Sequence, residues 1–480
     1  MINFRALKTA IVERNFVRNV IVLGSGNAGA QVISILVSPI LTRLYSTYDF
    51  GLLAVFSALL NTIGVISGLR YELAIPIEKD DKEAIHIVFL TFSISLLVAL
   101  LTLFLVTRYH HLIAIILNMS ALDYYLWLLP PSLIMLNLHQ LINYWTIREN
   151  AFLEISQTRI LQSISSVLVK MSAAEIGFLS LIIGDLIGQI LSFSYLLKKN
   201  ISKKNKIFRI SRGNLYLVAK KYRKFPIFAT WDSLLSMIGS QMPSILFAAY
   251  FDPAAAGFYA LSHRFISLPM QLIGQAIRDV FFSKAAEALK EGKVDLLTAS
   301  VHKELTRIAM MPVLLLSMIG PDLFQWIFGV EWREAGVFVR LMTPVLYLQF
   351  VFSPTIMLFH VLEKQEKLVI LQSITLMIRF SALFVGAKTG DLRTSVSLFS
   401  FASSISYVIF LIFLMRISGN KLVKAIIPSI NSFIHSVPII SPVAISTITG
   451  ANTAIKSGAV ALTLFLMIIR YSIIAKNLKV

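Results

Sequence analysis

The sequence predicts an all-α integral membrane protein with about 14 transmembrane helices, built as two pseudo-symmetric six-helix lobes plus a C-terminal helix pair. Three observations support this fold class. Hydrophobic residues make up 56% of the 480 positions and charged residues only 14%, the mean hydropathy is +0.76, and one short pattern near the start of the chain recurs about 206 residues later. A soluble protein of this length does not have such a composition.

Apolar segments of about 20 residues, the length that crosses a bilayer, follow one another along the chain with short connections. The basic, amphipathic N-terminal residues precede an apolar segment without a cleavage pattern, so we expect that segment to be kept as the first helix. The expected spans are 19–41, 50–69, 84–107, 124–145, 160–177, 178–197, 227–250, 257–281, 305–328, 336–360, 368–387, 394–415, 425–449 and 458–475.

Lys and Arg gather in alternate connections, which the positive-inside rule assigns to the cytoplasm together with both termini. The largest group is the stretch 198–224, with eleven basic residues and no acidic one, near the middle of the chain. We therefore expect an N-terminal lobe over residues 1–197, a basic cytoplasmic linker over 198–226, a C-terminal lobe over 227–415 and two further helices over 416–480.

The formal net charge of +19 is compatible with nucleic acid, but no folded basic module surrounds the basic stretch, so we favour a linker against anionic lipid and expect no nucleic acid. The absence of cysteine excludes disulfides, a cysteine nucleophile and a thiolate metal site. No P-loop occurs, and the glycines from Gly24 to Gly29 lie in an apolar helix, where close packing explains them. His110 lacks metal-ligand spacing, and Asp80 and Asp81 are expected on a solvated surface, so we expect neither metal nor cofactor.

The two halves share one short pattern. The stretch from Ser38, SPILTRLYSTYDFGLLAVF, is similar to the stretch from Pro243, PSILFAAYFDPAAAGFYAL, with Gly51 set against Gly257 and a turn before each. Because the offset spans six helices, both copies enter the membrane with the same orientation, and an axis along the membrane normal relates them. Two such bundles enclose a central cavity. Chance similarity of two apolar hairpins is the alternative.

The hairpin from Leu41 to Ala84 resembles the opening hairpin of bacterial Wzx-type polysaccharide flippases, of the multidrug/oligosaccharidyl-lipid/polysaccharide exporter superfamily. Its most specific pieces are Arg43-Leu44-Tyr45, Asp49-Phe50-Gly51 and Arg70-Tyr71-Glu72-Leu73-Ala74-Ile75. The resemblance implies a non-enzymatic protein of the bacterial inner membrane that turns an undecaprenyl-pyrophosphate-linked oligosaccharide, a repeat unit of O-antigen, capsule or exopolysaccharide, from the cytoplasmic to the periplasmic leaflet. It also implies membrane lipids, a downstream glycan polymerase and a chain-length regulator as partners. Many relatives have twelve helices, so the last two are given no role.

The eighth expected span carries the most extensive polar face. At 100° per residue, Arg264, Gln271, Gln275 and Arg278 fall within about 60° of one another. Such a face must look into protein or water, and it suits a cavity wall that holds a pyrophosphate by guanidinium groups and sugars by amides. Alternatively, Arg278 extends to the cytoplasmic interface and Arg264 is structural.

The first span carries a second polar face with Asn27, Gln31, Ser34 and Ser38, again within about 60°. Uncharged hydroxyls and amides suit sugars, and they equally suit hydrogen bonds between helices. Both interpretations stay open for these four side chains.

Other ionisable side chains within the expected spans are Lys170, Glu175, Asp185, Asp232 and Arg379. The first four are candidates for coupling transport to an ion, and Asp232 is alternatively a partner of Arg264. Lys170 and Glu175 turn about 140° from each other, so a pair within one helix is disfavoured. Arg379 keeps its charge and needs an anion, either a protein carboxylate or, as we favour, a substrate phosphate.

Three functions compete, and the favoured one is a flippase that works by alternating access of its two lobes. A cation-coupled multidrug exporter of the same superfamily would place carboxylates, and not Arg264 and Arg379, on the cavity face. An integral-membrane glycan polymerase or ligase would need large periplasmic loops, whereas the longest one expected here, 108–123, has about sixteen residues.

Overall fold

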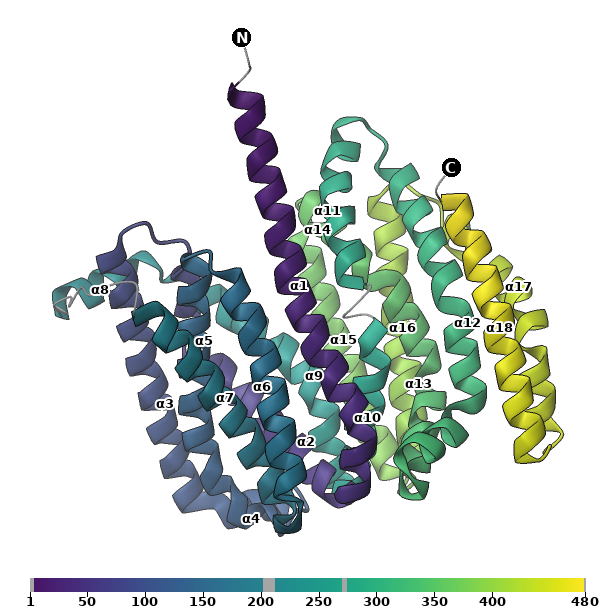
Figure 1. Ribbon diagram of the computed structural model, residues 1–480, viewed down its shortest axis with the longest axis horizontal. Helices are drawn as coiled ribbons and strands as arrows, with labels where there is room; N and C mark the ends of the chain where they lie inside the picture. Colours follow the sequence, from purple (N-terminus) through teal and green to yellow (C-terminus); the bar gives the residue numbers. More distant parts are fainter. Residues whose placement is uncertain (1–3, 202–211, 270–273, 479–480) are drawn as a thin grey trace. The chain divides into compact units, whose positions relative to one another are not determined.

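The computed structural model describes residues 4–201, 212–269 and 274–478, which form helices and no strand. Two compact units are present, Met1–Gly257 and Phe258–Val480, and Figure 1 shows long helices lying alongside one another within each unit. The all-α class that the composition predicts is confirmed. The division of the chain into lobes at residues 197 and 227 stays a prediction.

Long helices and short turns alternate in the first unit. Its α-helices are α1 Phe4–Leu44, α2 Thr47–Ser67, α3 Asp81–Ile116, α4 Leu122–Tyr125, α5 Leu129–Arg148, α6 Phe152–Ser172, α7 Phe178–Ile201, α8 Arg212–Lys221 and α9 Thr230–Tyr250. The short turns are the 3-10 helices η1 Tyr71–Ala74, η2 Leu126–Leu128 and η3 Ala174–Ile176 and the π-helix η4 Phe225–Ala229.

The helix α10 Pro253–Pro269 begins at the end of the first unit and continues into the second. The second unit then contains α11 Gln275–Lys290, α12 Val294–Phe328, α13 Arg333–Phe352, α14 Leu358–Val361, α15 Gln365–Lys388, α16 Leu392–Ile417, α17 Val423–Ile448 and α18 Thr453–Leu478. Its short 3-10 helices are η6 Val330–Trp332 and η7 Ser353–Met357. The pair α17 and α18 corresponds to the additional C-terminal helices.

Among the described residues, nine helical stretches are long and apolar enough to cross a membrane. They are α2, α3, α7, α12, the stretch Val330–Val361 that includes α13, and α15 to α18. The other expected spans coincide with α1, α5, α6, α9 and α10. Together these helices account for the about 14 spans that hydropathy predicts.

The expected division near residue 177 is a turn in the structure. The helix α6 ends at Ser172, Gly177 adopts a φ of 65°, and α7 begins at Phe178. Glycine tolerates this backbone region because it has no Cβ, so the chain reverses here. Glu175 lies in the turn and is exposed, outside the helix in which the sequence analysis places it.

The expected span 257–281 contains the end of α10 at Pro269 and the start of α11 at Gln275. Residues 270–273 lie outside the described part of the chain. A continuous polar face from Arg264 to Arg278 therefore stays a prediction.

Glycines allow close contacts of α6 with α1 and with α7. A Cβ on Gly26 of α1 would come within 2.6 Å of the Cα of Ser156 on α6. The close packing inferred from the glycine pattern is therefore confirmed at Gly26. On α7, Cβ atoms on Gly184 and Gly188 would lie 2.9 and 2.8 Å from backbone oxygens of α6. This spacing of four residues brings Asp185 against α6.

Candidate functional site

The second unit holds a cationic centre at Arg379, in the interior of α15. Its guanidinium carbon lies 5.3 Å from the centre of the Tyr407 ring on α16, a cation–π distance. The Nε of Arg379 is buried without a hydrogen-bond partner in the described part of the chain, and no ion pair joins Arg379 to a described carboxylate. An arginine keeps its charge in such surroundings, so this centre can receive an anion.

The aromatic rings of Tyr259 and His263 on α10 lie near the guanidinium of Arg379. Tyr259 stacks on His263 with 5.5 Å between the ring centres and meets Phe399 of α16 edge to face at 6.1 Å. Arg379 is close enough to act electrostatically on both Tyr259 and His263. The centre therefore combines one guanidinium with several aromatic walls, which is the kind of surface on which arginine recognises planar or phosphate-bearing ligands.

The other residues of the predicted cavity wall lie on two helices. Arg264 is exposed on α10, and Arg278 is partly buried on α11, where its Nε has no hydrogen-bond partner among the described residues. Gln271 and the side chain of Gln275 lie outside the described part. The structure thus places the two arginines, and the contribution of the two glutamines stays a prediction.

One residue on the polar face of α1, Ser34, contributes to the packing of α1 against α6. The hydroxyl of Ser34 lies 3.2 Å from that of Ser163 on α6, and Ser163 donates to the carbonyl of Ala30 at 3.0 Å. Ser34 therefore makes the interhelical hydrogen bond that the sequence analysis gave as one alternative. Asn27 is exposed and Gln31 is partly buried, so both remain available as candidate ligands for a sugar.

An ion pair joins α6 and α7 beside the glycine contacts. The Nζ of Lys170 lies 2.5 Å from Oδ1 of Asp185, and the hydroxyl of Ser166 donates to the same oxygen at 2.8 Å. The Lys170 side chain is only 12% exposed, whereas Asp185 is 45% exposed. Lys170 thus pairs with Asp185 on the neighbouring helix and not with Glu175, as expected. Asp185 is thus a carboxylate with a cation already in contact.

A cavity of about 200 Å³ opens beside Asp185 between α2, α5, α6 and α7. Ser57 and Asn61 line it from α2, and Gln189 lines it from α7. The Ser132 hydroxyl and the Gln189 amide oxygen are buried without hydrogen-bond partners among the described residues. This cavity was not predicted from the sequence. The spacing of four residues from Ser57 to Asn61 and from Asp185 to Gln189 was the available signal.

The remaining candidates lie outside these two centres. Asp232 is exposed in the first turn of α9, where the helix dipole favours a carboxylate. His110 and His111 contact Asp123 at 2.5 and 3.2 Å, and these contacts, His110 first, lower the pKa of Asp123. Within the described ranges, no group of three or more His, Asp or Glu side chains could hold a metal ion.

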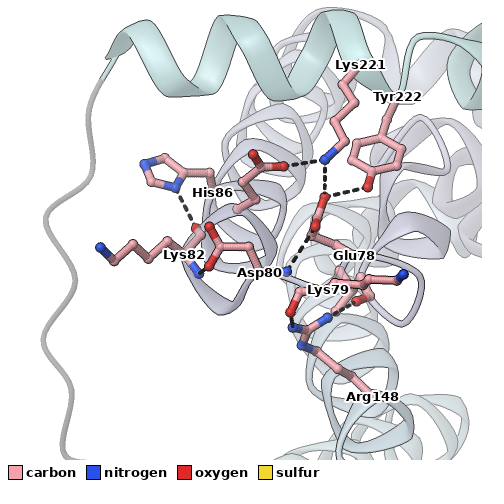
Figure 2. A network of polar contacts seen from close by, with 10 residues as sticks. Glu78, Lys79, Asp80, Lys82, His86, Arg148, Lys221 and Tyr222 are labelled. Carbon is pink, nitrogen blue, oxygen red and sulfur yellow. Dashed lines mark hydrogen bonds and ion pairs between the residues drawn. The ribbon is translucent and has the colours of Figure 1, made fainter.

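Within the first unit, a polar network ties α8 to the connection between η1 and α3 (Figure 2). Lys221, the last residue of α8, contacts both Glu78 and Glu83, and the Tyr222 hydroxyl donates to Glu78 at 2.6 Å. Burial raises the pKa of Glu78, but the hydrogen bonds from Lys221 and Tyr222 outweigh it and hold this pKa well below its usual range. The network therefore fixes α8 against the connection between η1 and α3.

Two further contacts hold the same connection. Arg148 donates to Asp81 at 2.9 Å and to the carbonyl of Lys79 at 3.1 Å. Asp80 accepts from the backbone N–H of Lys82 at 3.0 Å and caps α3. The expected solvated pair therefore has a structural role, since Asp80 caps a helix and Asp81 forms an ion pair.

Comparison with known proteins identifies a family. The chain matches the family model of polysaccharide biosynthesis proteins over residues 40–337, more than half of its length. The matched range contains the hairpin 41–84 on which the sequence resemblance rests. A search of curated proteins finds no match.

Solved transporter structures share the fold at low identity. A lipid II flippase, MurJ, in an inward closed conformation aligns with a TM-score of 0.72 at 16% identity, over 94% of this chain and 99% of that one. An inward-facing multidrug resistance transporter of the MATE family, in the MOP superfamily, aligns with a TM-score of 0.66 at 15% identity, over 81% and 95%. A MOP superfamily transporter from Pyrococcus furiosus gives 0.56 at 15% identity, over 84% and 96%. These alignments show the fold alone.

Proposed function

Because the chain belongs to the polysaccharide biosynthesis protein family, we propose that it is a flippase for an undecaprenyl-pyrophosphate-linked oligosaccharide, the repeat unit of O-antigen, capsule or exopolysaccharide. The cargo moves from the cytoplasmic to the periplasmic leaflet of the bacterial inner membrane, and both termini lie in the cytoplasm. The family match and the likeness to a lipid II flippase support a lipid-linked glycan as the class of cargo.

The main observation behind this proposal is that Arg379 contacts an aromatic ring and has no carboxylate partner in the described part of the chain. A guanidinium in the middle of a membrane helix is costly unless an anion compensates it. The described part of the chain supplies aromatic rings around Arg379 and no carboxylate partner. A pyrophosphate brings the missing negative charge and accepts the paired N–H donors of a guanidinium.

The proposed mechanism is alternating access of the two lobes, 1–197 and 227–415, around one cavity. Arg379 and Arg264 hold the pyrophosphate, while the lipid tail stays in the bilayer. Arg278 and the amides of the same region, Gln271 and Gln275, contact the cargo next to it. Because only positioning and charge are required, the chain acts without a cofactor and is not an enzyme.

The glycan would meet uncharged polar groups. On α1, Asn27 and Gln31 are the candidates, whereas Ser34, bound to Ser163, belongs to the packing of α1 on α6. The downstream glycan polymerase and the chain-length regulator would then receive the cargo on the periplasmic side.

A second candidate function, a cation-coupled multidrug exporter, is favoured by the carboxylate cavity beside Asp185. Lys170 already compensates Asp185, so a cationic drug or coupling ion must displace the lysine. Asp232, which is exposed, is the alternative coupling carboxylate. Glu175 lies in an exposed turn and is the weakest of the four coupling candidates.

Complementation tests the proposal. A strain that lacks this gene should accumulate the lipid-linked glycan on the cytoplasmic side and lose its surface glycan, as seen by mass spectrometry of extracted lipids, and the wild-type gene should restore export. Periplasmic activity of a reporter fused near Lys206 would contradict the topology. Normal surface glycan in the deletion strain, combined with increased drug sensitivity, would favour the exporter.

A further inference from the structure

A second cationic site lies in the second unit, among α12, α17 and α18, and shares no residue with the Arg379 centre. It is a cavity of about 580 Å³. Its polar lining comes from three helices and consists of Ser300, Lys303 and Arg307 on α12, Lys424, Asn431, Ser432 and His435 on α17, and Arg470 on α18. The additional helix pair, which the proposed transport mechanism leaves without a role, forms most of this cavity.

The cavity has an excess of positive charge. Glu304 lies 2.9 Å from Arg307, and Asp295 lies 3.7 Å from Lys424. Lys303 and Arg470 have no ion-pair partner within the described ranges, so two of the four permanent cations stay uncompensated. A bound anion would remove this excess.

The arginines of the cavity also repel each other. Arg470 donates to the backbone carbonyl of His435 at 2.5 Å, which fixes its guanidinium at the wall of the cavity. Arg307, on the facing helix, is close enough to act on the charge of Arg470. Two guanidinium groups held near each other form a site for a phosphate, which accepts hydrogen bonds from both.

Hydrogen bonds between the helices hold the walls of this cavity in place. The buried His302 of α12 contacts the carbonyl of Ala425 on α17 through Nε2 at 3.1 Å. The Tyr471 hydroxyl of α18 donates to the carbonyl of Ile308 on α12 at 2.6 Å. Since these residues neighbour Lys303, Lys424 and Arg470, the cations are fixed by the packing of the helices and cannot simply move apart.

The helices around the cavity expose apolar surface beside it. Only 22% of the span in α17 and 11% of that in α18 is buried within the protein. The exposed apolar side chains of α17 in this region are Ile426, Ile427, Ile430, Phe433 and Ile434, and Ile427 also lines the cavity. A ligand here meets cations at one end and an apolar helix face at the other, which is the chemistry of an amphiphile.

We propose that this cavity binds the phosphate headgroup of an anionic phospholipid, whose acyl chains lie along the exposed apolar face of α17. In the topology predicted from the charges, α12 and α17 begin and α18 ends at the cytoplasmic side. Basic pockets between helices at that side bind anionic headgroups. A polyprenyl pyrophosphate carries the same phosphate chemistry, but a site at the lipid-exposed pair α17 and α18 meets the abundant phospholipids of the bilayer first.

Native mass spectrometry of the full-length protein in a zwitterionic detergent tests this. The probes are cardiolipin, phosphatidylglycerol, phosphatidylcholine, undecaprenyl pyrophosphate and inorganic pyrophosphate. We expect the two anionic phospholipids to bind at least about tenfold more tightly than phosphatidylcholine. The double variant Arg307→Gln/Arg470→Gln should lose this preference. The control Lys284→Gln/Lys290→Gln removes the same charge from α11 of the same unit and should keep it.

Other outcomes overturn the assignment. Equal binding of phosphatidylcholine and phosphatidylglycerol, or an unchanged preference in the double variant, excludes the cavity as an anionic lipid site. Full competition by inorganic pyrophosphate indicates a soluble-anion site, and a strong preference for undecaprenyl pyrophosphate assigns the cavity to the carrier. If the double variant is unstable, Lys303→Gln, which breaks no ion pair with a described residue, should still weaken anionic lipid binding severalfold. Export in the deletion strain is scored separately, so failure here leaves the proposed function standing.

Discussion

Gly51 and Gly257, which the internal repeat sets against each other, are in direct contact. A Cβ on Gly51 would come within 1.7 Å of the carbonyl oxygen of Pro253, and one on Gly257 within 2.4 Å of that of Thr47. Thr47 and Pro253 are themselves equivalent in the repeat. Gly51 thus contacts Pro253, and its equivalent Gly257 contacts the equivalent of Pro253. Reciprocal contacts of this kind arise at a twofold axis. The contact therefore supports a local pseudo-twofold axis between these two turns.

The first prediction follows from this contact. Gly51→Ala or Gly257→Ala places a methyl group against backbone, which cannot rotate away, so each should destabilise the protein by about 1–3 kcal/mol. The measurement is the melting temperature of the purified protein in detergent, together with its abundance in the membrane. Gly458→Ala on α18, where a Cβ meets nothing within 4 Å, is the matched control and should change little. Equal melting temperatures for all three variants would contradict the close contact.

Much of the fold could be predicted because the membrane constrains it. Hydropathy alone places the spans, since each must be apolar and about 20 residues long, and the alignment of Gly51 with Gly257 anticipates a contact between distant residues. The exact position of a turn is harder to predict, because hydropathy fixes the end of a span only to within a few residues. Glu175, expected within a helix, lies in the turn before Gly177.

The polar sites were less predictable than the spans. A helical face can be read from one segment, but a partner depends on how two helices are rotated against each other. Lys170 pairs with Asp185 only because Gly184 and Gly188 bring α7 onto α6. The basic cavity is harder still, since Arg307 and Arg470 are far apart in the chain and, taken singly, look like ordinary positive-inside residues.

The second prediction concerns the pair Lys170 and Asp185. Lys170→Met leaves a partly buried carboxylate without its cation and should lower the melting temperature and the abundance of the protein. We expect a cost of about 1–3 kcal/mol, below that of a fully buried pair, because Asp185 is 45% exposed. The double variant Lys170→Met/Asp185→Asn should recover most of this loss, because both charges are removed together. Thermal melts of the wild type, Lys170→Met, Asp185→Asn and the double variant form a double-mutant cycle. Additive effects of the two single changes would exclude a direct interaction.

The third prediction is a pH dependence of the anchoring of α8. The pKa of Glu78 is lowered in the folded protein. The contribution of Glu78 to the anchoring of α8 is therefore complete above about pH 4.3, the ordinary pKa of Glu. This contribution is lost as the pH falls further. Hydrogen bonds to Glu78 and Glu83 raise the pKa of Lys221. The contribution of Lys221 to the anchoring of α8 is therefore complete below about pH 10.4 and is lost at higher pH. The anchoring is therefore strongest from about pH 5 to pH 10.

Hydrogen exchange of the α8 amides measures this anchoring. Lys221 is half exposed, so solvent screening limits its contribution to at most about 1 kcal/mol, or about fivefold in protection. Protection, corrected for intrinsic exchange, should fall between pH 5 and pH 3, and Lys221→Met should have low protection at both. Lys220→Met, on the exposed neighbour, is the control. Protection that does not change with pH in the wild-type protein would contradict the assignment.

The last prediction tests the anion centre. Arg379→Ala should abolish glycan export while abundance stays near normal, because no described carboxylate loses a partner. Arg379→Lys should restore export only in part, since an ammonium keeps the charge but lacks the planar pair of donors. Lys388→Ala removes a cation from the exposed end of the same helix and should leave export intact. Arg264→Ala should reduce export if both arginines hold the pyrophosphate.

A structural role for Arg379 gives a different pattern. In that case Arg379→Ala would lower the melting temperature or the abundance, because the Tyr407 ring would lose its cation–π contact. Export per molecule of protein would then change little. Mass spectrometry of the lipid-linked glycan, normalised to protein abundance, separates the two roles. Full export at normal abundance in the double variant Arg264→Ala/Arg379→Ala would exclude an anion-binding function of these two arginines.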